Sequence, residues 1–304
     1  MLRTRQDLVR LLGEGGGKRR LGVAAAHDAH TLQAVARAAG DGLIEPVLIG
    51  RAEEIRALWA REAGALPLPA VIPVEEDAAC AQAAVSMARG GEVDCIMKGR
   101  LETATLMREV VARDTGIRTG SVLSIVAMME SPYYYKLFAV TDVGLLTYPT
   151  LEQKKGIIQN AVGLFRALGA EEPKVAVLAA VERENPKIPE SVDAARLKQM
   201  QLDGLLGHCI VEGPISYDLC MDREAAAIKG YQSPVAGDPD ILVVPDIASG
   251  NLLSKALTCT GGAHTCGTVC GAAVPIVITS RSAPAEDKYM SIILAAAANP
   301  TQRR

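Results

Sequence analysis

Short runs of β-branched and aliphatic residues alternate with longer segments in which apolar residues recur at helical spacing. The predicted strands cover residues 20–26, 44–50, 93–99, 122–129, 137–142, 174–180, 208–216, 240–246 and 275–280. The predicted helices cover residues 1–17, 30–42, 52–64, 103–116, 149–169, 223–231, 249–263 and 287–298. This alternation is typical of βαβ units built around a mainly parallel sheet. The pattern therefore predicts an α/β fold.

The length of 304 residues exceeds one small domain and favours two α/β lobes. The character of the chain changes near residues 137–153, where a predicted strand leads into Pro149 and a long helix. If the closing helix packs back on the first lobe, that lobe comprises residues 1–143 plus 283–304. The second lobe then comprises residues 144–282.

Composition narrows the class of protein. Aromatic residues make up only 3% of the chain, so the core must be aliphatic. The 32 basic and 35 acidic residues leave a net charge of -3, which favours neither nucleic acid nor a membrane surface as partner. Residues 1–17 lack the uninterrupted apolar core of a signal peptide, and no later run is long enough to span a bilayer. Seven cysteines, an odd number, indicate free thiols in a reducing compartment, hence the cytoplasm.

Two groups of residues resemble metal ligands, but another role explains each group better. One group contains Cys259, His264, Cys266 and Cys270. It lacks a paired C-x-x-C knuckle and lies in a helix-like, Gly/Ala-rich segment, where small buried cysteines pack well. The other is His27 and His30 around Asp28, which follow a strand and precede a helix, so that Asp28 is expected to cap that helix. The sequence predicts no bound metal.

Cationic and hydroxyl side chains follow two of the predicted strands. Ser280 and Arg281 end the strand at 275–280, and Lys98 ends the strand at 93–99. Ligands of open α/β sheets bind beyond the carboxyl ends of the strands, and a guanidinium there can hold a phosphate by two hydrogen bonds. Arg108, on the helix after Lys98, supplies a further cation. Lys98 and Arg108 could equally be solvated surface charges.

Carboxylates and backbone amides offer the remaining chemistry. Asp287 lies near the start of the last helix, where it could take a proton from a nucleophile or only complement the helix dipole. In the segment 231–253, a strand leads to Asp246 and a helix start whose amides could receive anionic or carbonyl oxygens. Ordinary capping by Ser249 or Asn251 would also explain that start. No dinucleotide-binding or P-loop glycine motif is present.

Several segments together resemble the phosphate acetyl/butyryltransferase family, and more closely its butyryltransferase branch. They read KGRLETATLMREVV, TDVGLLTYPTLEQKKGIIQNAV, VERENPKIPESVDAARLKQM, GPISYDL, IKGYQSPVAGDPDILVVPDIASGNLLSKALT and VPIVITSRS. The resemblance implies two lobes of the isocitrate/isopropylmalate dehydrogenase-like fold, with the active site in the cleft between them. It also implies the reversible reaction of acyl-CoA and inorganic phosphate to acyl phosphate and CoA. CoA is then a substrate, and no cofactor is tightly bound.

The resemblance assigns roles to individual residues. Arg281, Ser280 and Arg108 match positions that bind the phosphoryl group or stabilise the transition state. Lys98 is also expected to bind the phosphoryl group. Asp287 matches the base that deprotonates the CoA thiol, while Ser280 or a backbone amide would stabilise the oxyanion. Residues expected at CoA and the cleft are Ser233, Gly237, Asp246, Gly250 and Asn251. The family further suggests a homo-oligomer.

Two departures from the family pattern bear on activity. Glu102 stands where histidine is common, and Ala283 and Pro284 replace an aspartate and a serine, which leaves Glu286 and Asp287 as candidate bases. We therefore expect a phosphate acyltransferase that prefers butyryl or a similar short chain over acetyl. The alternatives are a catalytically weak protein that binds CoA or acyl phosphate, and a metal-dependent 2-hydroxyacid dehydrogenase of the same fold.

Overall fold

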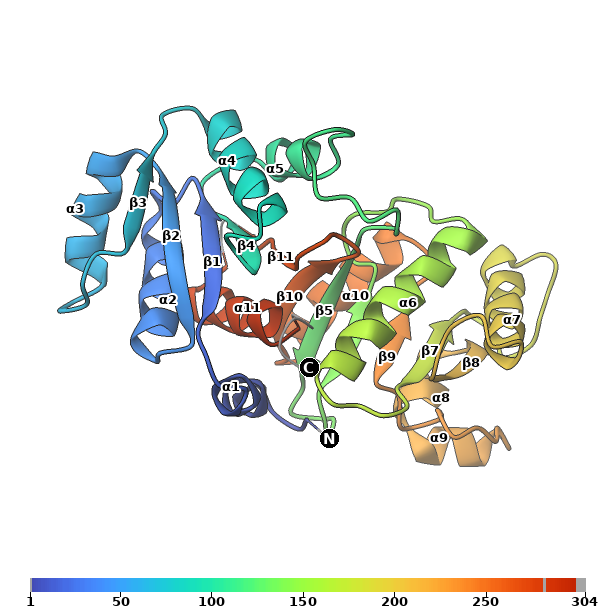
Figure 1. The fold of residues 1–304 in the computed structure, drawn as a ribbon. Coiled ribbons are helices and arrows are strands. Elements are labelled where there is room, and N and C mark those ends of the chain that lie inside the picture. The colour runs from blue at the N-terminus through green and yellow to red at the C-terminus, as the bar shows by residue number, and fades with distance from the viewer. Residues whose placement is uncertain (1, 281–282, 299–304) are drawn as a thin grey trace. The chain divides into compact units, whose positions relative to one another are not determined.

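The structure, a computed structural model, describes residues 2–280 and 283–298 (Figure 1). These residues form two compact units. The central unit contains Val122–Thr265 together with the described residues up to Thr4, and the flanking unit contains Arg5–Ser121 together with the described residues from Cys266 onward. Each unit is described below by itself.

The flanking unit is built on a sheet with the strand order β3-β2-β1-β4-β11-β10. The first five of these strands run parallel, and β10 pairs antiparallel with β11. The strands are β1 (Arg19–Ala24), β2 (Ile44–Gly50), β3 (Ala70–Pro73), β4 (Cys95–Lys98), β10 (His264–Cys270) and β11 (Ile276–Val277). The helices are α1 (Arg5–Glu14), α2 (Ala29–Gly40), α3 (Ala52–Glu62), α4 (Asp77–Arg89), α5 (Thr103–Val110) and α11 (Ala285–Ala298).

Helices of the flanking unit pack in two groups. Helix α2 contacts α3 and α11, whereas α4 contacts α5 and strand β1. Helix α11 is almost wholly buried, and Ile292, Ile293 and Leu294 are inaccessible to solvent. The last helix of the chain therefore belongs to the core of the unit that contains the first strands.

The central unit is built on a sheet with the strand order β5-β6-β9-β7-β8. Strands β6, β9, β7 and β8 run parallel, and β5 pairs antiparallel with β6. The strands are β5 (Ser124–Glu130), β6 (Phe138–Thr141), β7 (Lys174–Leu178), β8 (Ile210–Ile215) and β9 (Ile241–Val243). The helices are α6 (Leu151–Ala167), α7 (Pro189–Leu202), α8 (Tyr217–Met221), α9 (Arg223–Ile228) and α10 (Ile247–Cys259).

The core of the central unit is aliphatic, as the composition predicts. Phe138 is its one buried phenylalanine on a strand, and Val140, Leu242 and Ile215 pack in the same cluster. Helix α6 begins with a capping box. Thr150 Oγ1 accepts from the backbone N–H of Gln153, and Gln153 Oε1 accepts from the backbone N–H of Thr150. The start of the helix after Pro149 is thus specified locally.

The predicted fold class is confirmed, since both units are α/β with mainly parallel sheets. The unit boundaries differ from the predicted ones, because they fall at 121/122 and 265/266. Strands β5 and β6 pair with each other and join the central unit through β9, whereas β11 pairs with β4 of the flanking unit. The segment His264–Cys270 forms strand β10, although its sequence looked helix-like.

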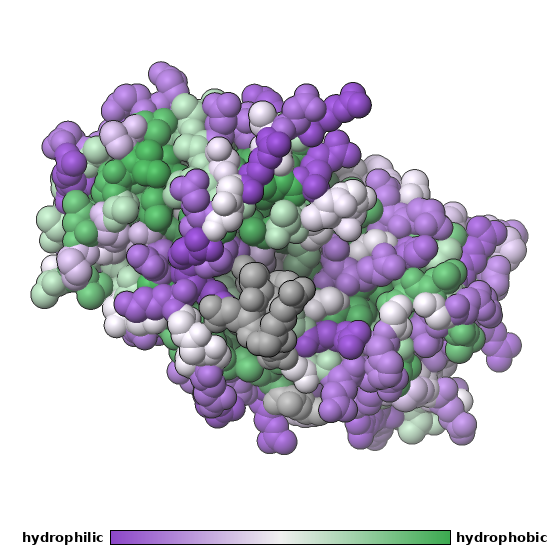
Figure 2. Space-filling model, viewed as in Figure 1, coloured by the Kyte–Doolittle hydropathy of each residue, from purple (hydrophilic) through white to green (hydrophobic). Residues whose placement is uncertain are grey.

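In the part of the chain that the structure describes, we find no helix with the length and apolar character of a membrane span. Figure 2 shows a mostly hydrophilic surface on the viewed face, with hydrophobic side chains gathered over the region of α3 and β3.

Candidate active site

Two segments that the sequence analysis selected leave the flanking unit's sheet at the same edge. Strands β4 and β11 are parallel neighbours, with Ile96 opposite Ile276 and Met97 opposite Val277. Lys98 follows Met97 directly, and Ser280 lies three residues after Val277. The carboxyl ends of these two strands therefore deliver Lys98 and Ser280 to one edge, as expected for a ligand site of an α/β sheet.

A pocket of about 470 Å³ lies at this edge. It is lined by Asp28, Asp77, Lys98, Gly99, Arg100 and Lys288. Lys98 is only 5% exposed, and its Nζ donates to the Leu101 carbonyl at 2.9 Å. The pocket thus joins the loop after β1, the loop after β4 and the start of α11, and we call it the cationic pocket.

Lys288 and Asp77 are members of this pocket that the sequence did not indicate. The Lys288 side chain is buried, and its Nζ donates to Thr279 Oγ1 at 3.1 Å and to the Ser280 carbonyl at 3.2 Å. Burial lowers the pKa of the Lys288 ammonium, and the negative charge of Asp28 partly opposes this effect. Lys288 follows two acidic residues at the start of a helix, a pattern that suggests a solvated face rather than a buried amine.

Asp28 caps helix α2, and this confirms the prediction from the sequence. Its Oδ2 accepts from the Thr31 amide at 2.8 Å and from Thr31 Oγ1 at 2.5 Å. Burial would raise the pKa of Asp28, but the hydrogen bonds from Thr31 outweigh it and lower the pKa. The carboxylate on the wall of the cationic pocket is therefore ionised near neutral pH.

The two candidate bases point to different partners. Glu286 is exposed and pairs with Arg37 of α2, whose guanidinium also lies 3.9 Å above the Tyr289 ring. Asp287 is partly buried, and its Oδ1 lies 3.7 Å from Arg5 Nη1. Glu286 is thus held by a surface ion pair, while Asp287 keeps a more sheltered position. Arg281 lies outside the described residues.

Arg108 is exposed on α5 and does not line the cationic pocket. Leu106 and Val110 form the buried face of that helix. Within the flanking unit, Lys98 and Ser280 therefore lie at the same end of the sheet, while Arg108 is an exposed residue outside the lining of the cationic pocket.

The five residues expected at CoA lie in the central unit and divide between two edges of its sheet. Ser233 and Gly237 precede strand β9, at the amino ends of the parallel strands. Asp246, Gly250 and Asn251 follow β9, at the carboxyl ends. Because the two sets lie at opposite ends of strand β9, the structure does not bring them together.

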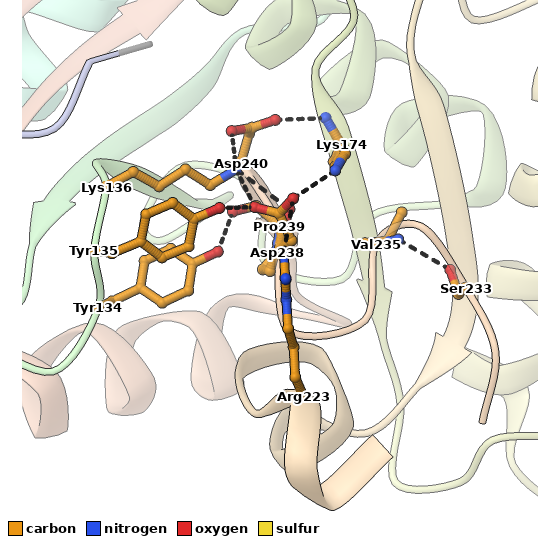
Figure 3. Close-up of polar contacts among 10 residues, drawn as sticks. All are labelled: Tyr134, Tyr135, Lys136, Lys174, Arg223, Ser233, Val235, Asp238, Pro239 and Asp240. Atoms are coloured by element: carbon orange, nitrogen blue, oxygen red, sulfur yellow. Dashed lines mark hydrogen bonds and ion pairs between the residues drawn. The ribbon is translucent and has the colours of Figure 1, made fainter. Parts of the chain in front are cut away.

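The amino-end edge of this sheet holds a charged cluster rather than an open site (Figure 3). Asp238 lies 2.9 Å from Lys136 Nζ, 2.5 Å from Lys174 Nζ and 3.4 Å from Arg223 Nη2. Asp240 accepts from Lys136 Nζ at 2.6 Å and from the Lys174 amide at 2.8 Å. Ser233 lies apart from this cluster, and its Oγ accepts from the Val235 amide at 3.1 Å. The cluster ties the starts of three strands together.

The local structure explains why position 237 is a glycine. Its φ of +65° is one that residues with a Cβ rarely adopt, and a Cβ there would lie 2.1 Å from Arg223 Cγ. The turn before β9 therefore requires glycine for close packing, whether or not a ligand binds nearby.

At the carboxyl-end edge, Asp246 caps helix α10. Its Oδ1 accepts from the Ser249 amide at 2.8 Å, and Ser249 Oγ accepts from the Asp246 amide at 3.2 Å. The cap is therefore Asp246 itself, rather than Ser249 or Asn251. A Cβ at Gly250 would lie 2.6 Å from the Asp142 carbonyl, so glycine allows α10 to approach the end of β6. Asn251 is exposed on α10.

Asp142, at the end of β6, organises the neighbouring loop. Its carboxylate accepts from the backbone amides of Ile125, Gly144, Leu145 and Leu146. Burial raises the pKa of Asp142, and these amide hydrogen bonds oppose the rise. Among residues 2–280 and 283–298, no three His, Cys, Asp or Glu side chains gather as a metal site would require.

Comparison with known proteins supplies the family. A family model described as phosphate acetyl/butaryl transferase matches residues 64–296, which is more than half of the chain. The chain belongs to this family. The resemblance predicted from the sequence is thus confirmed, and so is membership of the acyltransferases.

Both branches of the family are similar to this chain. A phosphate acetyltransferase of Thermotoga maritima is 42% identical over 94% of this chain and 96% of its own. A phosphate butyryltransferase of Clostridium acetobutylicum is 37% identical over 91% of this chain and 92% of its own. The crystal structure of a branched-chain phosphotransacylase from Enterococcus faecalis has a TM-score of 0.82 and 34% identity, over 93% of this chain and 99% of its own. Phosphate acyltransferase chemistry is common to all three names.

Proposed function

We propose that this protein reversibly transfers a short-chain acyl group between CoA and inorganic phosphate, with butyryl or a similar chain preferred over acetyl. The observation that carries the proposal is the arrival of Lys98 and Ser280 at one sheet edge, beside a pocket with three cationic side chains. The similarity to a butyryltransferase and to a branched-chain phosphotransacylase supports the chain preference. A cytoplasmic location and a homo-oligomeric state belong to the same proposal.

In the proposed reaction, a phosphate oxygen attacks the thioester carbonyl of acyl-CoA. The new carbon–oxygen bond forms as the carbon–sulfur bond breaks, and the proton of hydrogen phosphate passes to the departing sulfur. Arg281, Ser280, Lys98 and Arg108 are proposed to hold the phosphate. Asp287 is proposed to carry the proton, and in the reverse direction it accepts the proton of the CoA thiol. Asp246, Gly250 and Asn251 are proposed to contact CoA at the carboxyl ends of the central unit's strands.

The test is release of free thiol from a panel of acyl-CoAs, measured with and without phosphate. We expect release only with phosphate, and a higher kcat/KM for butyryl-CoA or isobutyryl-CoA than for acetyl-CoA. Thiol release that does not depend on phosphate would contradict the reaction. A higher kcat/KM for acetyl-CoA would contradict only the chain preference.

A further inference from the structure

Lys288 is a buried lysine whose described partners are all uncharged. Its side chain is 3% exposed, and both of its hydrogen bonds end on neutral oxygens, those of Thr279 Oγ1 and the Ser280 carbonyl. Among the residues that the structure describes, no carboxylate forms an ion pair with it. A buried ammonium that lacks an anionic partner is costly, so such a residue needs an explanation.

Two other buried lysines of this chain, Lys136 and Lys154, do have carboxylate partners. Lys136 is 2% exposed and lies 2.6 Å from Asp240 Oδ1, and Lys154 is 6% exposed and lies 2.8 Å from Asp193 Oδ2. The contrast shows that the fold can supply a counter-ion to a buried lysine. Lys288 instead lines the cationic pocket.

The charges on the pocket wall favour an anionic ligand. Three cations, Lys98, Arg100 and Lys288, face two carboxylates, Asp28 and Asp77. Asp28 already accepts two hydrogen bonds from Thr31 in its role as helix cap. An anion with several acceptor oxygens could therefore engage the cations without replacing an existing ion pair of Lys288.

We propose that Lys288 binds a phosphate group in the cationic pocket and, through the Ser280 carbonyl, holds the end of β11 against that group. This inference rests on the proposed function, which supplies two sources of phosphate: inorganic phosphate and the phosphates of CoA. Lys98 and Arg100 complete the subsite. One ammonium thus serves both the ligand and the loop that carries Ser280.

The experiment compares Lys288→Met, which keeps the length of the side chain but removes its charge, with Lys288→Arg and with a control, Lys18→Met, at an exposed lysine of the same unit. The KM for phosphate, the KM for butyryl-CoA and the preference for CoA over dephospho-CoA are measured for each protein. Removing a charged hydrogen bond to phosphate should raise the relevant KM by roughly tenfold to a hundredfold. Lys288→Arg should recover part of the loss, and Lys18→Met should match the unmutated protein.

Melting temperatures separate ligand binding from a purely structural role. Without ligand, Lys288→Met should melt no lower than the unmutated protein, because a buried unpaired charge has been removed. Added inorganic phosphate should raise the melting temperature of the unmutated protein more than that of the variant. A loss confined to the KM for phosphate identifies inorganic phosphate as the ligand, and a loss confined to CoA with reduced discrimination against dephospho-CoA identifies the CoA phosphate.

The proposal is overturned if Lys288→Met leaves both KM values and the phosphate-induced shift unchanged, or if it only lowers the melting temperature. These outcomes differ from failure of the proposed function. In that case the unmutated protein itself would show no phosphate-dependent thiol release.

Discussion

Replacing Asp238 by asparagine should destabilise the central unit, because one carboxylate there neutralises several cations. Asp238 is 8% exposed and contacts Lys136, Lys174 and Arg223, and it also accepts from the Tyr135 hydroxyl. Asparagine keeps the shape of the side chain but removes its charge. Lys136 retains Asp240, so the expected loss stays below the roughly 3–5 kcal/mol of a completely orphaned buried charge.

The size of the loss follows from the pKa of Asp238. Burial alone would raise that pKa, but hydrogen bonds from Lys174, Tyr135 and Lys136 outweigh it and lower the pKa to about 2, against an ordinary value of 3.8. This difference corresponds to about 2 kcal/mol of unfolding free energy. Because the folded-state pKa is the lower one, the contribution is fully present above the ordinary value and disappears as the pH falls through about 2.

The assay is urea unfolding of Asp238→Asn and the unmutated protein at pH 7 and at a series of acidic pH values. The matched control is Asp218→Asn, since the pKa of Asp218 is also lowered, by Ser216 and Lys229, but its side chain is 52% exposed. We expect a smaller loss for the control, because solvent screens an exposed pair. Equal losses at the two sites, or a difference between Asp238→Asn and the unmutated protein that persists undiminished at low pH, would refute the reasoning.

Two further predictions concern the flanking unit. Asp287→Asn should lower kcat roughly a hundredfold or more, with little change in the KM for phosphate, because it removes the proposed general base. Glu286→Gln removes only a surface ion pair with Arg37 and should change kcat little. Steady-state kinetics that show the reverse would make Glu286 the base. Gly99→Ala should destabilise the protein by about 1–3 kcal/mol or more and raise the KM for phosphate, because the new Cβ would lie 2.2 Å from the Ala25 carbonyl. The control is Gly163→Ala in the interior of α6, where the new Cβ would meet no atom within 4 Å beyond its own helix backbone and chain neighbours. This variant should be neutral or stabilising in urea unfolding, and equal stability of the two variants would contradict the steric argument.

Much of the fold was predictable because strands and helices here differ in period and composition. The run at 44–50 and the helix at 52–64 correspond closely to β2 and α3. Strand β10 was not predictable in the same way, since His264–Cys270 lacks a run of aliphatic residues and is held in the sheet by pairing with β11. The unit boundaries also depend on strand pairing, and the local pattern of apolar residues does not reveal which strands pair.

The candidate site was predictable where it depends on strand ends and less so where it depends on burial. Lys98 and Ser280 follow recognisable strands, whereas Lys288 is buried by elements far away in the sequence. The motif that contains Ser233 and Asp246 reads as one continuous signal. Yet strand β9 lies between its halves, and only the three-dimensional arrangement shows that they occupy opposite edges.

The division of the chain into units has a consequence for biosynthesis. The ribosome completes Val122–Thr265 before it makes β11 and α11. In the flanking unit, β11 lies between β4 and β10, and α11 packs against α2. The central unit can therefore fold while the strands translated before it still lack their final neighbour. During that interval β4 has an unpaired edge, and an unpaired strand edge is a place where a growing chain can misassociate until translation delivers β11.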